Sequence, residues 1–134
     1  MASPPKQVKI DDNESQMSLL VWLDKDADST DENRNAQIPL RELNSNLKLF
    51  KLVEECKQFI QDESTTSQIV LIVSGLLGES LVPLIDDEQK VVSIYVYCGD
   101  KARHEKWAAN YSKVVSISLI ENRFHSLREY RFGL

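Results

Sequence analysis

The chain has 134 residues and a formal net charge of −5 at pH 7. Its 42% hydrophobic and 28% charged residues suit one domain with a core, which excludes collagenous, low-complexity and wholly disordered chains. The longest apolar run, around 69–73, is far shorter than the ~20 residues that cross a bilayer. Two cysteines and the lack of an apolar leader predict a cytoplasmic protein that does not associate with membranes.

The chain opens with a polar stretch that gives way to an apolar run. Residues 1–16 contain few apolar side chains, so we expect a disordered, solvated tail there. Residues 19–23 form a continuous apolar run that ends at Asp24. Such a run predicts a strand that is buried on both faces.

The segment after this strand carries conflicting helix signals. Ser29 and Glu32 have the spacing of a capping box, which predicts a helix from Thr30 onward. Pro39 would remove a hydrogen bond from the interior of that helix. We therefore expect a kink at Pro39, or a helix that begins only near this residue.

The rest of the chain alternates between strand and helix patterns. An alternating stretch at 47–50 predicts an edge strand with one wet face. Continuous apolar runs predict further buried strands at 69–73, 92–97 and 114–117. Apolar residues at helical spacing predict helices at 52–60, 77–85, 104–111 and 120–131. Pro83 is expected in an early turn of its helix, where proline costs little.

This alternation of strands and helices defines the expected fold. Five strands joined by helices require right-handed crossovers and a parallel sheet covered on both faces. We expect residues 17–134 to form a single three-layer α/β/α sandwich. The flavodoxin-like strand order 2-1-3-4-5 fits best, because the second strand is the polar edge and the first, third and fourth are the most apolar.

Several phrases of the sequence resemble a known module. They are Val21–Asp24, IVLIVSGLLG at 69–78, Pro83–Ile85, and SIYVYCGDKARHEK at 93–106 with Trp107. The chain is similar over residues 17–118 to an N-terminal domain of multidomain invertebrate proteins, where this domain precedes mono-ADP-ribosyltransferase domains or tetratricopeptide repeats. The resemblance implies a module that works beside another domain. In architecture it also looks like the receiver domains of two-component signalling, an analogy of fold alone.

The receiver analogy implies an active-site edge that has lost its chemistry. Receiver domains carry a phosphoacceptor aspartate after the third strand, and Ser74 stands at that position. Cys98 stands where a hydroxyl follows the fourth strand, and the last strand ends in Ser118 without a lysine. These departures argue against phosphorylation of an aspartate.

A ligand site, if the chain has one, is expected where the carboxyl ends of the strands meet. Asp24, Asp26 and Asp28 have the hard oxygen ligands that Mg²⁺ prefers, but we favour a turn cap within a solvated acidic loop. The candidate ligand-binding residues at this edge are Asp24, Asp26, Ser74, Gly75, Gly78, Cys98 and Gly99.

The glycines of the segment Ser74–Gly78 have two interpretations. Backbone N–H groups at the start of the following helix could hold a phosphate or carboxylate. The alternative, which we favour, is that Gly75 permits a tight turn and Gly78 lets the helix approach the sheet.

Cys98 and His104 invite comparison with a thiolate–imidazole pair. We expect His104 instead to share a helix face with Trp107 and Ala108, pointing toward the sheet and away from the strand tip. Cys98 is then a small buried hydrophobe. No zinc pattern, nucleophile elbow or catalytic carboxylate pair is recognisable, so we predict no catalytic residue, metal ligand or cofactor.

A complete fold signal with an active-site edge empty of reactive groups favours a non-catalytic regulatory or interaction module. Residues 11–35 carry eight acids and two bases, whereas 101–134 carry three acids and seven bases, an asymmetry that could steer a protein partner or an adjoining domain. A pI near 5.0 argues against nucleic acid. The alternative is a small-ligand or nucleotide/NAD-binding domain, and a third, weaker option is self-association through the closing helix. The oligomeric state stays open.

Overall fold

The computed structural model describes residues 18–43 and 46–119. The strands are β1 (Leu19–Leu23), β2 (Lys48–Phe50), β3 (Ile69–Ser74), β4 (Val91–Cys98) and β5 (Val114–Leu119). The helices are α1 (Asp31–Leu43), α2 (Val53–Gln61), α3 (Gly75–Ile85) and α4 (Lys101–Ala108). The tail expected over 1–16 and the closing helix expected over 120–131 lie outside the described residues.

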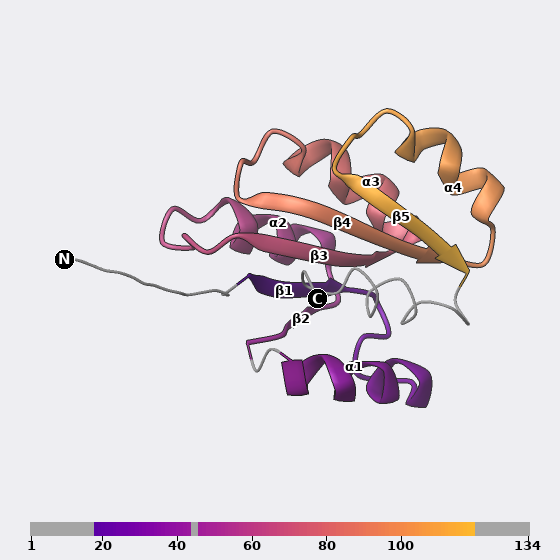
Figure 1. The fold of residues 1–134 in the computed structure, drawn as a ribbon, viewed down its shortest axis with the longest axis horizontal. Helices are drawn as coiled ribbons and strands as arrows, with labels where there is room; N and C mark the ends of the chain where they lie inside the picture. The colour runs from indigo at the N-terminus through magenta and orange to yellow at the C-terminus, as the bar shows by residue number, and fades with distance from the viewer. Residues whose placement is uncertain (1–17, 44–45, 120–134) are drawn as a thin grey trace.

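The strands form one five-stranded parallel sheet in the order β2-β1-β3-β4-β5, which confirms the predicted topology (Figure 1). β3 lies in the middle, with β1 and β4 as its neighbours. All five residues from Ile69 to Val73 are buried, which explains why this run carries no polar side chain. β2 lies at an edge and is partly exposed, as its alternating sequence predicted.

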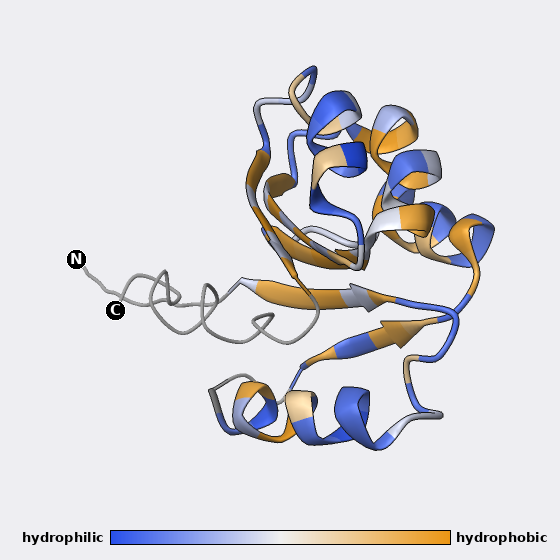
Figure 2. Cartoon of the chain, turned by 90° about the vertical axis from the view of Figure 1, so that its right-hand side faces the viewer, coloured by the Kyte–Doolittle hydropathy of each residue, from blue (hydrophilic) through white to orange (hydrophobic). Residues whose placement is uncertain are grey.

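The two faces of the sheet pack against different helices. One face contacts α2 and α3 through Cys56, Ile60, Leu81, Val82 and Ile85, and Trp107 of α4 packs at the margin of this core. The opposite face contacts α1 through Ala36 and Leu40. Figure 2 shows α1 separated from the other helices by the sheet, so the described elements form the three layers expected from the sequence.

Helix α1 runs without a break from Asp31 to Leu43 with Pro39 inside it, which corrects the prediction of a helix that begins only near Pro39. It begins at Asp31, and Thr30, rather than Ser29, supplies the cap: the Thr30 hydroxyl accepts the Asn33 backbone N–H at 3.2 Å. Proline costs a helix the hydrogen bond to the carbonyl four residues earlier. That carbonyl belongs to Asn35, whose exposed position leaves it accessible to water.

Two further boundaries differ from the sequence predictions. Helix α3 starts at Gly75, directly after β3, so Pro83 lies near its end and not in an early turn. Helix α4 starts at Lys101 because the Asp100 carboxylate accepts the Arg103 backbone N–H at 3.1 Å and so caps an earlier turn than expected. None of the helices in the described part of the chain is long and apolar enough to span a membrane.

Candidate functional site

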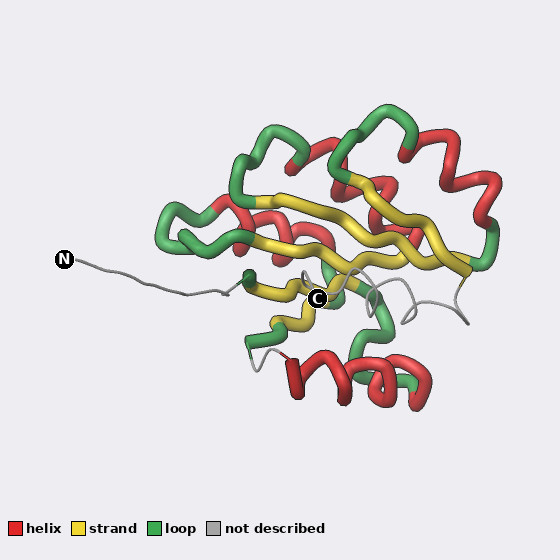
Figure 3. The backbone as a smooth tube through the Cα atoms, viewed as in Figure 1, coloured by secondary structure: helices red, strands yellow, loops and turns green. Residues whose placement is uncertain are grey.

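The carboxyl ends of the parallel strands meet at one edge of the sheet, which we call the rim (Figure 3). The segments that follow β1, β3 and β4 leave the sheet here. In the observed order β2 lies on one side of β1, whereas β3, β4 and β5 are added on the other side, so the strand order reverses between β1 and β3. Open α/β sheets bind ligands in the crevice at such a point. The side chains next to this point therefore decide whether the rim can hold a ligand.

Asp24 follows β1 directly and is only 8% exposed. Its Oδ1 accepts the backbone N–H of Asp26 at 2.9 Å, which closes the turn after the strand. Its Oδ2 accepts the Asn33 side-chain amide at 3.3 Å, and that amide also donates to the Asp26 carbonyl at 2.9 Å. The carboxylate thus ties the β1–α1 loop to the first turns of α1.

Tyr97 connects this loop to the other side of the sheet. Its hydroxyl donates to Asp24 Oδ2 and accepts the indole N–H of Trp22 at 3.0 Å. In register, Tyr97 lies opposite Ser74 at the end of β3, and β3 separates β4 from β1. The Tyr97–Asp24 hydrogen bond therefore crosses the end of β3 at the crevice. Buried polar groups that satisfy one another in this way are unavailable to a ligand without a cost.

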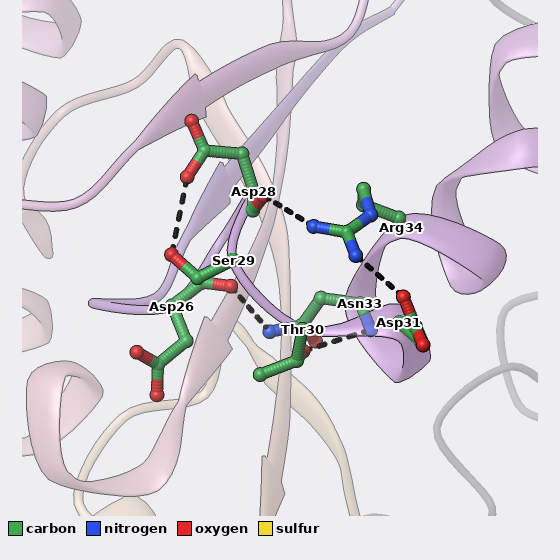
Figure 4. A network of polar contacts seen from close by, with 7 residues as sticks. All are labelled: Asp26, Asp28, Ser29, Thr30, Asp31, Asn33 and Arg34. Atoms are coloured by element: carbon green, nitrogen blue, oxygen red, sulfur yellow. Dashed lines mark hydrogen bonds and ion pairs between the residues drawn. The ribbon is translucent and has the colours of Figure 1, made fainter.

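Asp26 and Asp28 do not converge with Asp24 on a common point. In Figure 4 the carboxylates of Asp26 and Asp28 point away from each other. Asp28 is paired with Lys51 at 2.8 Å, and this hydrogen bond holds the pKa of the Asp28 carboxyl below its usual value. Within residues 18–43 and 46–119, no group of three or more histidine, cysteine or acidic side chains could hold a metal ion. The loop has the form of a turn cap followed by solvated acids.

The start of α3, like that of α2, has no side chain that caps its backbone N–H groups. Ser74 has the extended conformation of an N-cap residue, but its hydroxyl makes no capping hydrogen bond. Leu76, in the first turn, is 60% exposed, whereas Leu77 packs partly against the core. Neither side chain plugs the rim at this point.

The two glycines of α3 make room for side chains of α4. A Cβ on Gly75 would lie 2.5 Å from His104 Nε2, and one on Gly78 would lie 3.0 Å from Val73 and 3.4 Å from the Trp107 ring. Gly78 thus allows the close approach to the sheet that the sequence suggested. Gly75 instead admits His104, so this buried histidine lies at the level of the strand tips and not away from them as predicted.

The cysteines have the environment of buried thiols. Cys98 lies at the end of β4, where burial raises the pKa of its thiol, and Sγ donates to the Ser118 carbonyl at 3.8 Å. Burial raises the pKa of Cys56 in α2 to about 12. His104 Nδ1 accepts the Trp107 indole N–H at 2.8 Å, so neither member of the suggested thiolate–imidazole pair engages the other.

The candidate residues therefore divide into separate environments. Asp24 and Cys98 are buried and hydrogen bonded, and Gly78 is packed inside. Asp26 is half-buried, and Gly99 is exposed with open space around it. Only Ser74 and Gly75 lie at an uncapped helix start.

Two partners of Asp24 were not foreseen from the sequence. Asn33 gave no usable signal, because its place after Thr30 indicates only a capped backbone N–H, whereas its side-chain amide contacts Asp24. Tyr97 was counted only as part of an apolar strand. Its position at the strand end, next to a rim that needs hydrogen-bond donors, was the available clue.

Comparison of the chain with protein-family models, with curated proteins and with solved structures finds no match.

Replacing Tyr97 with phenylalanine is expected to lower the free energy of unfolding by about 1–3 kcal/mol. The change removes the hydroxyl from between the Trp22 N–H and the Asp24 carboxylate and leaves both buried groups short of a partner. Urea unfolding measures the effect. Tyr111→Phe, at a half-buried ring beside Trp107, is the matched control and should change stability by less than about 0.5 kcal/mol. Equal effects of the two changes would contradict the role assigned to Tyr97.

Both thiols are expected to resist alkylation by iodoacetamide at pH 7.5. Burial raises the pKa values of both thiols, so the reactive thiolate is scarce at this pH. The alkylation rate of Cys98 should therefore increase only above pH 9, the ordinary pKa of a cysteine thiol. Mass spectrometry of wild type and of Cys98→Ser assigns the label. Rapid labelling of Cys98 at neutral pH, absent from Cys98→Ser, would show an activated thiol and disprove this assignment.

Proposed function

We propose that this protein is a non-catalytic regulatory or interaction module, with a degenerate receiver-like rim, that acts by contact with a protein partner or an adjoining domain. The proposal is consistent with the resemblance of residues 17–118 to an N-terminal module of multidomain proteins. It places the working surface at the rim, on the loops and helix starts that follow the strands.

The observation that carries the proposal is the use of Asp24 inside the fold. In a sheet of this order, the carboxylate after the first strand is well placed to act on a ligand in the crevice. Here each of its oxygens accepts a hydrogen bond from the chain itself, and Tyr97 spans the end of β3. Ser74 and Cys98 occupy the neighbouring strand ends without an activating partner among the described residues.

The same edge presents apolar side chains to solvent. Leu52, immediately before α2, is 58% exposed and Leu76, in the first turn of α3, is 60% exposed. Both helices follow parallel strands and cover the same face of the sheet, so both starts lie at the rim. Exposed leucines beside charged loops are typical of the apolar centre and polar border of a protein interface.

The nucleotide- or NAD-binding alternative has less support from this geometry. It requires Asp24, Gly78 and Cys98 to face a ligand, but Gly78 packs against Val73 and Trp107, and the other two side chains are hydrogen bonded internally. Ser74 at an uncapped helix start, the half-buried Asp26 and the exposed Gly99 remain accessible to a ligand.

Nucleotides offer a direct test of this alternative. NAD, ATP and Mg²⁺, each at 1 mM, are expected to leave the Tm within about 2 °C of the ligand-free value. A ligand bound at a hundred times its Kd would stabilise the fold by about 2.7 kcal/mol and raise the Tm by roughly 10 °C. Differential scanning fluorimetry measures the shift. A rise of that size with any of the three would replace the interaction module with a ligand-binding domain.

A carboxylate introduced in place of an exposed leucine at the rim is expected to weaken partner binding. Leu52→Asp and Leu76→Asp each place a carboxylate in the proposed interface and should weaken a partner's Kd at least ~tenfold. The control is Leu84→Asp, an equal change at the 46% exposed position near the end of α3, away from the rim.

The partner is found by photo-crosslinking from position 76 in an extract of the native cells, then purified and titrated against each variant by calorimetry. Retained affinity in both rim variants, or equal loss in Leu84→Asp, would refute the rim as the interface.

A further inference from the structure

We propose that the start of α3 is a binding site for an oxyanion, a phosphate or carboxylate group, held by backbone N–H groups of the first turn and by the Nε2–H of His104. The inference goes beyond the proposed function and does not depend on it, since it concerns a chemical group and not a protein interface.

The first part of the site is the helix start itself. The first N–H groups of a helix have no partner within the helix, and the aligned peptide dipoles favour negative charge there. In α3 the N-cap residue Ser74 leaves them without a side-chain cap, and the first turn contains no acidic residue. By contrast, Thr30 caps α1 and Asp100 caps α4, and α2, which also lacks a side-chain cap, carries Glu54 and Glu55 in its first turn.

The second part of the site is a buried donor beside the same turn. His104 is 4% exposed, and its Nδ1 accepts the Trp107 indole N–H. An imidazole nitrogen that accepts a hydrogen bond carries no proton, so the proton of the neutral ring is on Nε2. The structure gives Nε2 no acceptor within residues 18–43 and 46–119.

The packing of α4 on α3 directs this donor to the helix start. His104 Nε2 would lie 2.5 Å from a Cβ on Gly75, the first residue of α3. The nitrogen is therefore beside the first turn of α3, whose backbone N–H groups have no side-chain cap. An oxyanion bound there would accept from this nitrogen and from the backbone together.

The donors also define the kind of ligand. All are N–H groups, so the ligand must supply acceptors, which phosphate and carboxylate oxygens do. Among the described residues, the nearby guanidinium of Arg103 is engaged with Glu79 at 3.2 Å. Because the site then lacks a free cationic side chain, we expect affinity in the millimolar range for an isolated anion, with the rest of a larger ligand supplying more.

The experiment is an NMR titration of the ¹⁵N-labelled chain with inorganic phosphate at constant ionic strength, with chloride as the balancing anion. We expect the amide signals of Gly75, Leu76 and Leu77 and the Trp107 indole signal to shift together and saturate with a single millimolar Kd. Parallel titrations with phenyl phosphate and benzoate distinguish the two ligand chemistries. Failure of these signals to saturate with all three anions would overturn the proposal.

Leu76→Asp tests the assignment without removing a core side chain. Its carboxylate would occupy the start of α3, a change that tends to stabilise a helix, and should weaken phosphate binding about tenfold or more. Leu52→Asp is the matched control, since it adds the same charge before α2 and should leave the affinity within about twofold. Unchanged binding in Leu76→Asp, or equal loss in Leu52→Asp, would show that phosphate binds elsewhere.

His104→Gln tests the side-chain donor. Glutamine keeps an N–H donor but cannot reproduce the ring position set by Trp107, so phosphate affinity should fall while the α3 amides still respond. Heteronuclear spectra of this variant first establish that the fold is retained. Wild-type affinity in a folded His104→Gln chain would remove His104 from the site.

These outcomes are separable from those of the proposed interaction function. Leu52→Asp is expected to lose a protein partner but to keep phosphate. A chain that binds phosphate and has no partner at the rim would support the oxyanion site alone, and the reverse result would support the interaction module alone.

Discussion

The structure depends on burial of the central strand β3 on both of its faces. Ile69, Leu71 and Val73 face the core shared with α2 and α3, while Val70 and Ile72 face the side of α1. Strands buried in this way contribute apolar area to two cores at once, so the sheet stays together only when helices cover both faces. This burial accords with the central position of β3, between β1 and β4.

Burial of the sheet also determines the chemistry at its edge. Polar groups that terminate apolar strands need partners inside the protein, because an unpaired buried donor or acceptor costs about 1–3 kcal/mol. Asp24, Tyr97 and Trp22 satisfy each other in this way. The crevice between β1 and β3 is thereby used for cohesion of the fold. This use of the carboxylate is the basis of the interaction module that we propose.

The fold could be predicted because continuous apolar runs and helical spacing are local properties of the chain. The parallel sheet and its order followed from the alternation of these signals and from the polar edge strand. Pro39 misled the prediction of α1, since the penalty of a proline depends on whether water reaches the freed carbonyl, which spacing does not reveal.

The candidate site was less predictable, because its contacts join residues far apart in sequence. Tyr97 reaches Asp24 only because a single strand, β3, separates β4 from β1. His104 contacts Gly75 only because α4 packs on α3. Single-residue signals identified Asp24 and Gly75 but not the partners that define their environments.

The contact between Gly75 and His104 couples the side-chain sizes that the fold tolerates at these two positions. A Cβ at position 75 would lie 2.5 Å from the imidazole, so alanine there requires the His104 ring to shift or a smaller residue to replace it. A smaller residue at 104 alone would leave a void beside the start of α3. Substitutions at positions 75 and 104 must therefore compensate each other in side-chain volume. This requirement constrains how the sequence of this protein can diverge.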